Sequence, residues 1–300
     1  MNIYRAGLTG CLAACVIPES KVYHLESEPV LHKAVLRFRT DEISKITGIP
    51  FKKIKVSKSV FDGDIFCNWD PQLANQYSKK VINGLYDRSI ANLETVDRWL
   101  APADFHEQLI EILNDRIYFS SIAYPIDSDF AAISTLPLPE LMSILNEVRE
   151  DFNWGIKNHF NSIYVSTVDV KIPSEVHQTI YFPEPNCEVY RATLEGRKLI
   201  IECTEETEGE DLEWVPAMFG LDTLDWEFSE INYKQKIGKI APIEEIQRKE
   251  LICMITEEHN IYSLGRTAIW KNILLDDCLQ DVKKIQEMLN KSRYDRMLGR

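Results

Sequence analysis

The residues best suited to chemistry lie near the start of the sequence, in the stretch AGLTGCLAAC. Gly7 and Gly10 have the spacing of a turn that lets the backbone approach a diphosphate. Leu8 and Thr9 lie between them, where a helix would begin and its free N–H groups would attract an anion. Glu26 ends the next apolar segment, KVYHLE, where a carboxylate can accept hydrogen bonds from a ribose. Strand, glycine turn, helix and strand ending in an acid together indicate a nucleotide-binding unit.

The glycine pattern differs from the common one at its first position. A G-x-G-x-x-G turn would have glycine at 5, 7 and 10, whereas this chain has Arg5, Gly7 and Gly10. The first glycine normally allows a sharp turn out of the strand, so Arg5 either adopts ordinary dihedrals or carries strain. Its guanidinium could also contact a phosphate directly. The alternative interpretation is an α/β core that binds no nucleotide.

Basic residues follow the second predicted strand. His32, Lys33 and Arg37 lie where a chain leaving that strand would pass near a bound nucleotide. They are therefore candidates for orienting a substrate or polarising a cofactor. The alternative is a solvated basic loop.

Two later segments predict further parts of the same site. FAAISTLPLP is a buried strand that ends at Ser-Thr, which places Thr135 at the carboxyl edge of the sheet, where open α/β sheets bind ligands. In YSLGRTAIWK a strand leads to Gly265 and Arg266, and a long amphipathic helix is expected to begin there. This turn would present N–H groups and a cation to a diphosphate.

Size and charge exclude several classes of protein. The chain has 300 residues, of which 45% are hydrophobic, and a formal net charge of −13. That charge does not favour binding of nucleic acid through phosphate neutralisation, although a local basic channel stays open. No apolar run approaches the roughly 20 residues that span a bilayer. Leu8–Cys11 resembles a lipoprotein cleavage box, but the segment before it is too short and too polar for a leader.

The cysteines and histidines do not form a recognisable metal or disulfide pattern. Seven scattered cysteines without a C-x-x-C pair favour reduced thiols and a cytoplasmic protein. His106-Glu107 begins like a zinc-protease motif, but Ile110 stands where the second histidine belongs. We therefore expect no metal site.

The order of elements predicts an α/β protein with discontinuous domains. A nucleotide-binding domain is expected to combine residues 1–66, 124–148 and 240–300. Residues 67–123, including SIANLETVDRWL, are expected to form a helical cap. Residues 149–239 contain short alternating segments typical of an antiparallel sheet, expected to form a substrate domain.

Three of these pieces together resemble a known family. AGLTGCLAA with KVYHLE, AAISTLPLP and YSLGRTAIWK are similar to the flavin-binding segments of the amine-oxidase superfamily. The branch of UDP-galactopyranose mutase and protoporphyrinogen oxidase is nearest, because VYRATLEGRKLIIE is similar to a sheet strand of that branch. The size and arrangement also resemble FAD-dependent oxidoreductases of bacteriophages.

The resemblance implies a Rossmann-type, GR2-like domain that binds FAD. The pyrophosphate would lie at Gly7–Gly10 and the adenosine ribose at Glu26. Thr135 would lie near the adenine, and Gly265-Arg266 near the pyrophosphate or the flavin ring. The paired glycines that usually follow the ribose acid are absent, and EPVLHKAV stands in their place.

Three functions are compatible with this sequence. The first is an FAD-dependent oxidoreductase that takes hydride from a C–H group next to an amine or alcohol. Its substrate would be a small molecule or a modified nucleotide, such as an aminoacyl-modified thymine. The second is a sugar-nucleotide mutase in which reduced flavin acts as a nucleophile. The third is a binding or inhibitory protein on a flavoprotein scaffold that has lost its activity.

Overall fold

The chain folds into two compact units, each built from separated segments. The computed structural model describes residues 1–32, 34–87, 89–146, 160–229 and 232–290. The first unit comprises Met1–Lys52, Trp99–Trp154 and Pro242–Arg300. The second unit comprises Lys53–Arg98 and Gly155–Ala241.

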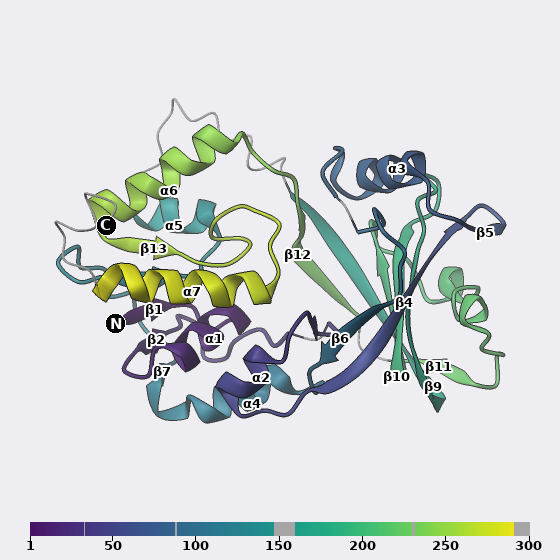
Figure 1. Cartoon of the computed structure of the whole chain (residues 1–300), viewed down its shortest axis with the longest axis horizontal. Coiled ribbons are helices and arrows are strands. Elements are labelled where there is room, and N and C mark those ends of the chain that lie inside the picture. Colours follow the sequence, from purple (N-terminus) through teal and green to yellow (C-terminus); the bar gives the residue numbers. More distant parts are fainter. Residues whose placement is uncertain (33, 88, 147–159, 230–231, 291–300) are drawn as a thin grey trace. The chain divides into compact units, whose positions relative to one another are not determined.

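A parallel sheet of five strands forms the centre of the first unit (Figure 1). Its order is β13-β8-β1-β2-β7, and every neighbouring pair is parallel. The strands are β1 (Asn2–Tyr4), β2 (Lys21–Tyr23), β7 (Ile117–Tyr118), β8 (Ala132–Ser134) and β13 (Ile261–Ser263). β1 lies between β2 and β8, so the chain order reverses beside it, as in doubly wound α/β folds.

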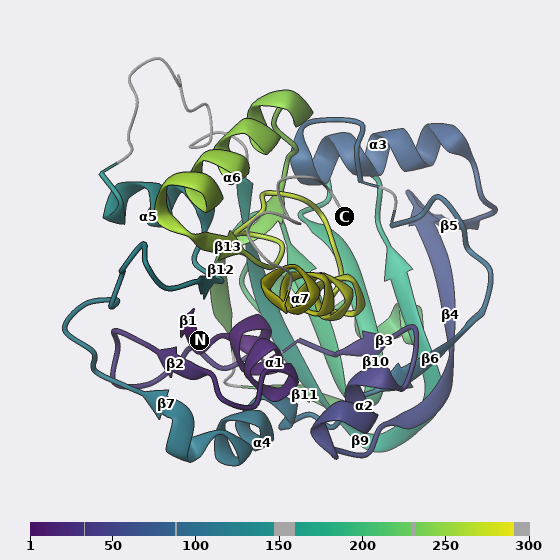
Figure 2. The ribbon, with the colours of Figure 1, turned by 60° about the vertical axis from the view of Figure 1, so that its left-hand side comes forward.

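Helices cover this sheet on both sides, and α6 and α7 lie on opposite sides of β13 (Figures 1 and 2). The helices are α1 (Leu8–Val16), α2 (Glu42–Thr47), α4 (Phe105–Ile112), α5 (Leu138–Ile144), α6 (Glu245–His259) and α7 (Leu275–Asn290). α1 packs against α2, α4 and α7. It is short and uniformly apolar because it is enclosed by these neighbours, and Gly10–Ala14 are all buried.

The second unit is built on a long, bent hairpin. β9 (Phe160–Tyr181) pairs antiparallel with β10 (Val189–Cys203), and the register shifts around Gly196, whose φ is +58°. β4 (Lys52–Asp62) adds to β9 in parallel, so this sheet is mixed. The remaining strands are β5 (Ile65–Cys67), which pairs with β4, and β11 (Trp226–Phe228) and β12 (Tyr233–Ile240), which pair with β9.

One helix of the second unit, α3 (Pro71–Ile82), packs on β9, β10 and β12. Its start is fixed by Asp70, whose carboxylate accepts from the N–H of Gln72, and its end by Asn83 in the left-handed conformation. Short 3-10 helices at Glu210–Leu212 and Pro216–Phe219 cover the core around Leu212 and Val215.

Buried charges lie beneath α3. The Lys239 ammonium is 3.1 Å from the Asp87 carboxylate, and the two side chains are 12% and 7% exposed. The Arg191 guanidinium pairs with the Glu202 carboxylate, which also accepts from the Tyr190 hydroxyl at 3.0 Å. Lys239 and Arg191 therefore each have a carboxylate partner.

The α/β class predicted from the sequence is confirmed, whereas several elements differ. SIANLETVDRWL, expected to be helical, contains the strand β6 (Val96–Leu100). The end of β6 pairs with β3 (Arg37–Phe38), and α2 was not expected at all. Residues 67–123, expected to form one helical cap, are divided between the two units at Arg98, and β7 within them joins the parallel sheet.

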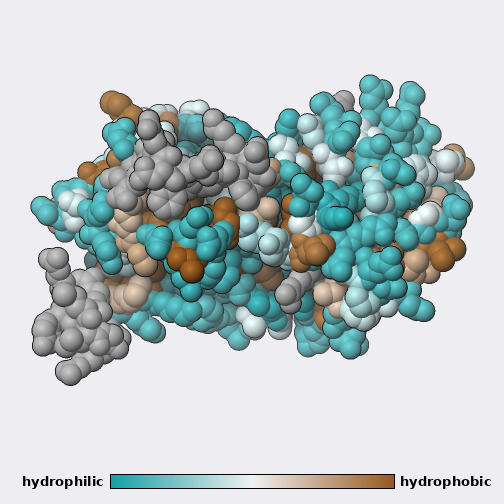
Figure 3. Space-filling view, turned by 90° about the horizontal axis from the view of Figure 1, so that it is seen from above, coloured by the Kyte–Doolittle hydropathy of each residue, from teal (hydrophilic) through white to brown (hydrophobic). Residues whose placement is uncertain are grey.

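The surface shows small, separate hydrophobic groups among hydrophilic side chains on the face drawn in Figure 3. In the described part of the chain, no helix combines the length and the apolar character needed to cross a membrane.

Candidate functional site

The carboxyl ends of the parallel strands gather the residues singled out in the sequence. Each of four strands is followed directly by one group of them, at one edge of the sheet. Arg5, Gly7, Leu8, Thr9 and Gly10 follow β1; Glu26 follows β2; Thr135 follows β8; Gly265 and Arg266 follow β13. The fold thus places segments from the start, middle and end of the chain at the same edge.

The turn into α1 leaves room for an anion. Gly7 is the N-cap residue of α1. Because it is glycine, no side chain caps the N–H groups of the first turn. A Cβ added at Gly7 would meet no atom within 4 Å. By contrast, a Cβ at Gly10 would lie 2.1 Å from the carbonyl oxygen of Arg5. Gly10 is therefore required for close packing of helix on strand, whereas a side chain at Gly7 would project into the open space in front of the helix.

Arg5 occupies the position of the missing first glycine in a left-handed conformation, with φ of +80°. This conformation costs an L-residue roughly 1–2 kcal/mol. The Arg5 N–H donates to the carbonyl of Tyr23 at 2.8 Å, and its guanidinium lies 3.3 Å from the Glu140 carboxylate on α5. Of the two conformations considered from the sequence, the strained one is present.

Thr135 and Gly265 support the glycine turn from the neighbouring strands. The Thr135 hydroxyl donates to the carbonyl of Tyr4 at 2.9 Å and lies against Gly10. Gly265 has φ of +98°, and a Cβ there would be 3.0 Å from the Thr9 methyl group. Contacts from the ends of β8 and β13 therefore hold Gly10 and Thr9 in place.

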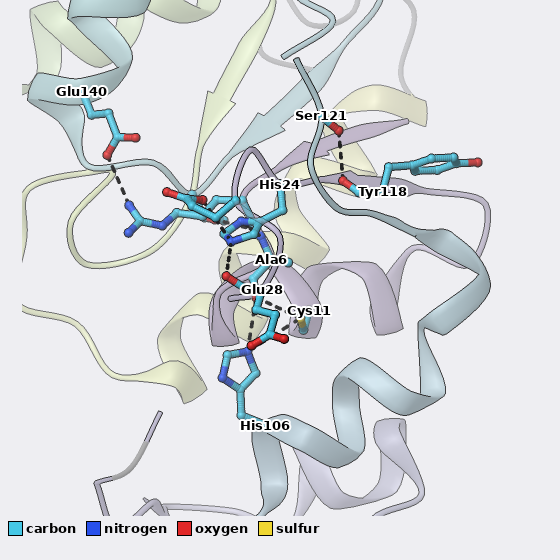
Figure 4. Close-up of polar contacts among 11 residues, drawn as sticks. Ala6, Cys11, His24, Glu28, His106, Tyr118, Ser121 and Glu140 are labelled. Atoms are coloured by element: carbon cyan, nitrogen blue, oxygen red, sulfur yellow. Dashed lines mark hydrogen bonds and ion pairs between the residues drawn. The ribbon is translucent and has the colours of Figure 1, made fainter. Parts of the chain in front are cut away.

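Two buried histidines hold the peptide groups of Ala6 (Figure 4). The Ala6 N–H donates to Nδ1 of His24 at 3.3 Å, and Nε2 of His106 lies 3.2 Å from the Ala6 carbonyl oxygen. His106 accepts the backbone N–H of His32 at Nδ1, at 3.1 Å. Because each Nδ1 is an acceptor, each ring carries its proton on Nε2 and is neutral. We call His24 and His106 the histidine clamp.

Electrostatics favours the neutral form of the clamp. Burial lowers the pKa of His24, and the nearby Glu26 carboxylate only partly opposes this effect. Burial likewise lowers the pKa of His106, opposed by its hydrogen bond to Ala6. At neutral pH the clamp therefore holds the turn without adding positive charge to it.

Glu26 keeps most of its carboxylate exposed. One oxygen lies 3.1 Å from Nε2 of His24, and the side chain is 70% exposed. The Glu26 carbonyl oxygen accepts from the N–H of Ser120 at 2.9 Å, which fixes the backbone. A carboxylate held in this way can accept further hydrogen bonds from hydroxyl groups.

The three catalytic candidates have different positions. His32 is partly buried, and burial, then the nearby His106 and Arg266, lowers its pKa to about 4. Its Nε2 has no hydrogen-bond partner among the described residues. Arg37 lies on β3, paired with Leu100. Lys33 lies outside the described residues.

The sequence analysis did not identify the histidine clamp or Glu140. His24 directly follows β2 and is buried, and a histidine in the apolar segment before Glu26 was an available signal. His106 comes from α4 and Glu140 from α5, far along the chain from Arg5 and Ala6. No local pattern indicates such contacts.

Comparison with known proteins shows the same architecture at low sequence identity. No family model and no curated protein matches the sequence. A proposed FAD-containing monooxygenase from Photorhabdus luminescens matches with a TM-score of 0.52 and 10% identity, covering 96% of this chain and 87% of that one. An oxidoreductase from Methanosarcina mazei matches with a TM-score of 0.56 and 10% sequence identity, covering 95% of this chain and 99% of that one.

A CLA-producing fatty acid isomerase from P. acnes matches with a TM-score of 0.57 and 12% identity, covering 97% of this chain and 98% of that one. This chain shares its fold with these proteins. The likeness extends over nearly the whole of each chain, so it includes both units.

Proposed function

We propose that this protein binds FAD and acts as an oxidoreductase. The observation that carries the proposal is the glycine turn: Gly7 leaves open space before α1, Gly10 allows helix and strand to touch, and Glu26 follows the next parallel strand. This arrangement suits a diphosphate followed by a ribose. The FAD-containing neighbour with the same fold supports the choice of flavin.

The chain's own residues would divide the binding between them. The first-turn N–H groups of α1 would meet the diphosphate, and Glu26 would accept from the ribose hydroxyls. The histidine clamp would hold Ala6, and with it the direction of the turn. Thr135 would position Gly10 rather than contact the adenine, because its hydroxyl already donates a hydrogen bond to the Tyr4 carbonyl.

The proposed reaction is oxidation of a C–H group next to an amine or alcohol. Bound FAD would supply the two-electron acceptor for the hydride. His32 would act as a neutral imidazole, whose buried Nε2 has no hydrogen-bond partner among the described residues. Arg266, which follows the β13 turn, would contribute positive charge there. Lys33 and Arg37 stay further candidates on the same segment.

The test is a visible absorption spectrum of the purified protein, together with thermal melts with and without FAD. We expect a flavin spectrum or a clear rise in melting temperature. Gly7→Ala should leave the melting temperature of the FAD-free protein unchanged but weaken FAD binding, because its methyl group enters only the open space. Gly209→Ala in the second unit is the matched control and should alter neither property.

A second candidate is a binding protein that has lost the cofactor. It is favoured by the strained Arg5, whose guanidinium is engaged by Glu140 beside the turn. A colourless protein whose melting temperature does not respond to FAD would support it and contradict the oxidoreductase. The search would then turn to macromolecular partners.

A further inference from the structure

The second unit contains a cavity of about 320 Å³ that the proposed function does not use. Three separate segments build it: the β4–β5 turn, the turn between β9 and β10, and the short helices around residues 210–219. Its walls include Phe61, Asp64, Phe182, Glu184, Trp214 and Met218. The volume is at the lower end of the range for small-molecule sites.

Aromatic rings form its apolar walls at steep angles to one another. The Phe182 and Trp214 rings are 5.4 Å apart with an interplanar angle of 89°. The Phe61 and Phe182 rings are 6.1 Å apart at 66°. Phe182 is buried at 2% exposure and packs edge-on with both neighbours, so the aromatic surface that the cavity offers to a cation comes from Phe61 and Trp214.

The polar lining is acidic. Asp64 is carried into the wall by the tight β4–β5 turn, where Gly63 has φ of +64°, and Glu184 comes from the β9–β10 turn. Cys187 also lines the cavity, and burial raises the pKa of its thiol, so it is uncharged at neutral pH. The ionised lining groups are thus both carboxylates.

One nearby ammonium is already engaged. Nζ of Lys80 donates to the carbonyl oxygens of Phe182 and Val189, at 2.8 and 2.7 Å. It therefore binds the backbone of the β9–β10 turn and helps to hold Phe182 in place. Its charge leaves the site with one net negative charge when both carboxylates are ionised.

We propose that this cavity binds an organic cation with an alkylated ammonium head. The aromatic faces would contact the N-methyl or N-methylene groups, and Asp64 and Glu184 would balance the charge. A neutral ligand of the same size would lack this attraction, and an anionic ligand would also be repelled by the carboxylates. The head group could belong to a free amine or to a methylated lysine of another protein.

Isothermal titration of the full chain with choline tests the cation, and 3,3-dimethylbutanol is its neutral isostere. We expect saturable choline binding that is at least about tenfold tighter than binding of the isostere. A trimethyllysine peptide, titrated in parallel, distinguishes the two sources. Preference for choline indicates a free amine, and preference for the peptide indicates a protein partner; either supports the site.

Variants locate the binding. Trp214→Ala should weaken choline binding about tenfold. Trp69→Ala removes a similarly exposed tryptophan that does not line the cavity and should change nothing. Asp64→Asn combined with Glu184→Gln should also weaken binding, whereas the exposed Glu227→Gln should not. No saturable binding of choline or the peptide, or equal binding of the isostere, would overturn the proposal, whatever the protein does with FAD.

Discussion

Single residues determine the shape of the turn after β1. Ala6 is bonded through its N–H to His24 and through its carbonyl to His106, and Gly10 packs directly on Arg5. These contacts leave the Arg5 backbone little freedom to relax. The left-handed conformation of Arg5 is therefore imposed by its surroundings rather than by its own preference.

Replacing Arg5 separates this strain from the ion pair. Arg5→Gly and Arg5→Ala both lose the pair with Glu140, but only glycine accepts φ of +80° without strain. We expect Arg5→Gly to be more stable than Arg5→Ala by about 1 kcal/mol in the free energy of unfolding. Urea denaturation of the two variants measures this difference, and equal stabilities would show that the turn relaxes. Arg5→Gly should also bind FAD more tightly than the parent.

The buried histidines predict a loss of stability in acid. The pKa of His32 is lowered from 6.5 to about 4 in the folded protein, so the unfolded chain holds more protons between these values. The free energy of unfolding should be fully retained above pH 6.5 and fall as the pH decreases toward 4. For His32 the loss is up to about 3 kcal/mol.

His32→Phe keeps the ring and removes its titration. Its free energy of unfolding should therefore fall less between about pH 7.5 and pH 5 than that of the parent. An unchanged slope in His32→Phe would mean that this imidazole is not buried as a neutral group.

At the scale of elements, α3 depends on the charges beneath it. Asp87→Asn leaves the Lys239 ammonium without its carboxylate while keeping a similar shape. We expect a loss of about 3 kcal/mol in the free energy of unfolding. Asp97→Asn is the control, since its pair with Lys53 is exposed and screened by solvent, so its loss should change the free energy of unfolding much less. The double variant Asp87→Asn, Lys239→Met should recover part of this loss in stability. If it does not, the loss in Asp87→Asn does not come from the unpaired Lys239 ammonium.

Local patterns predicted some elements well. The β1–α1–β2 unit could be read directly, because one short segment contains the glycines, the apolar helix and the strand that ends near Glu26. Within residues 67–123, expected to be helical, α3 is present, and Asp70 and Pro71 mark its start in the structure. In both cases the signals that define the element lie next to one another in the chain.

Other elements depend on distant partners. β6 was expected to be helical, and its pairing with β3 is not visible in the local sequence. The last helix was expected directly after Arg266, but α7 begins at Leu275. The residues between Arg266 and Leu275 form turns. One of them, Thr267, accepts a hydrogen bond at its carbonyl from the N–H of Leu138, far away in the sequence.

At the scale of the whole molecule, the first unit depends on its N-terminal strand. β1 lies between β2 and β8, and Ile3 and Tyr4 are almost completely buried. Deletion of residues 1–11 should therefore unfold the first unit and abolish FAD binding. Hydrogen exchange should lose its protection in β2 and β8 and keep it in β9 and β10.

The hydrogen-exchange pattern of the deletion variant shows whether the two units unfold separately or together. Protection retained only in the second unit would show that this unit is stable without the first. Loss of protection in both would show that they unfold together, and retained flavin after the deletion would refute the assignment of β1 and α1 to the cofactor site.

The discontinuity of the units has a consequence for synthesis on the ribosome. β1 is made before its neighbours: β8 follows about 130 residues later and β13 only after Asn260, so the parallel sheet cannot form until these later strands are made. The second unit is complete at Ala241. It can therefore close while the ends of the first are still apart, and the nascent chain would exit with an inserted unit folded before the one that contains it.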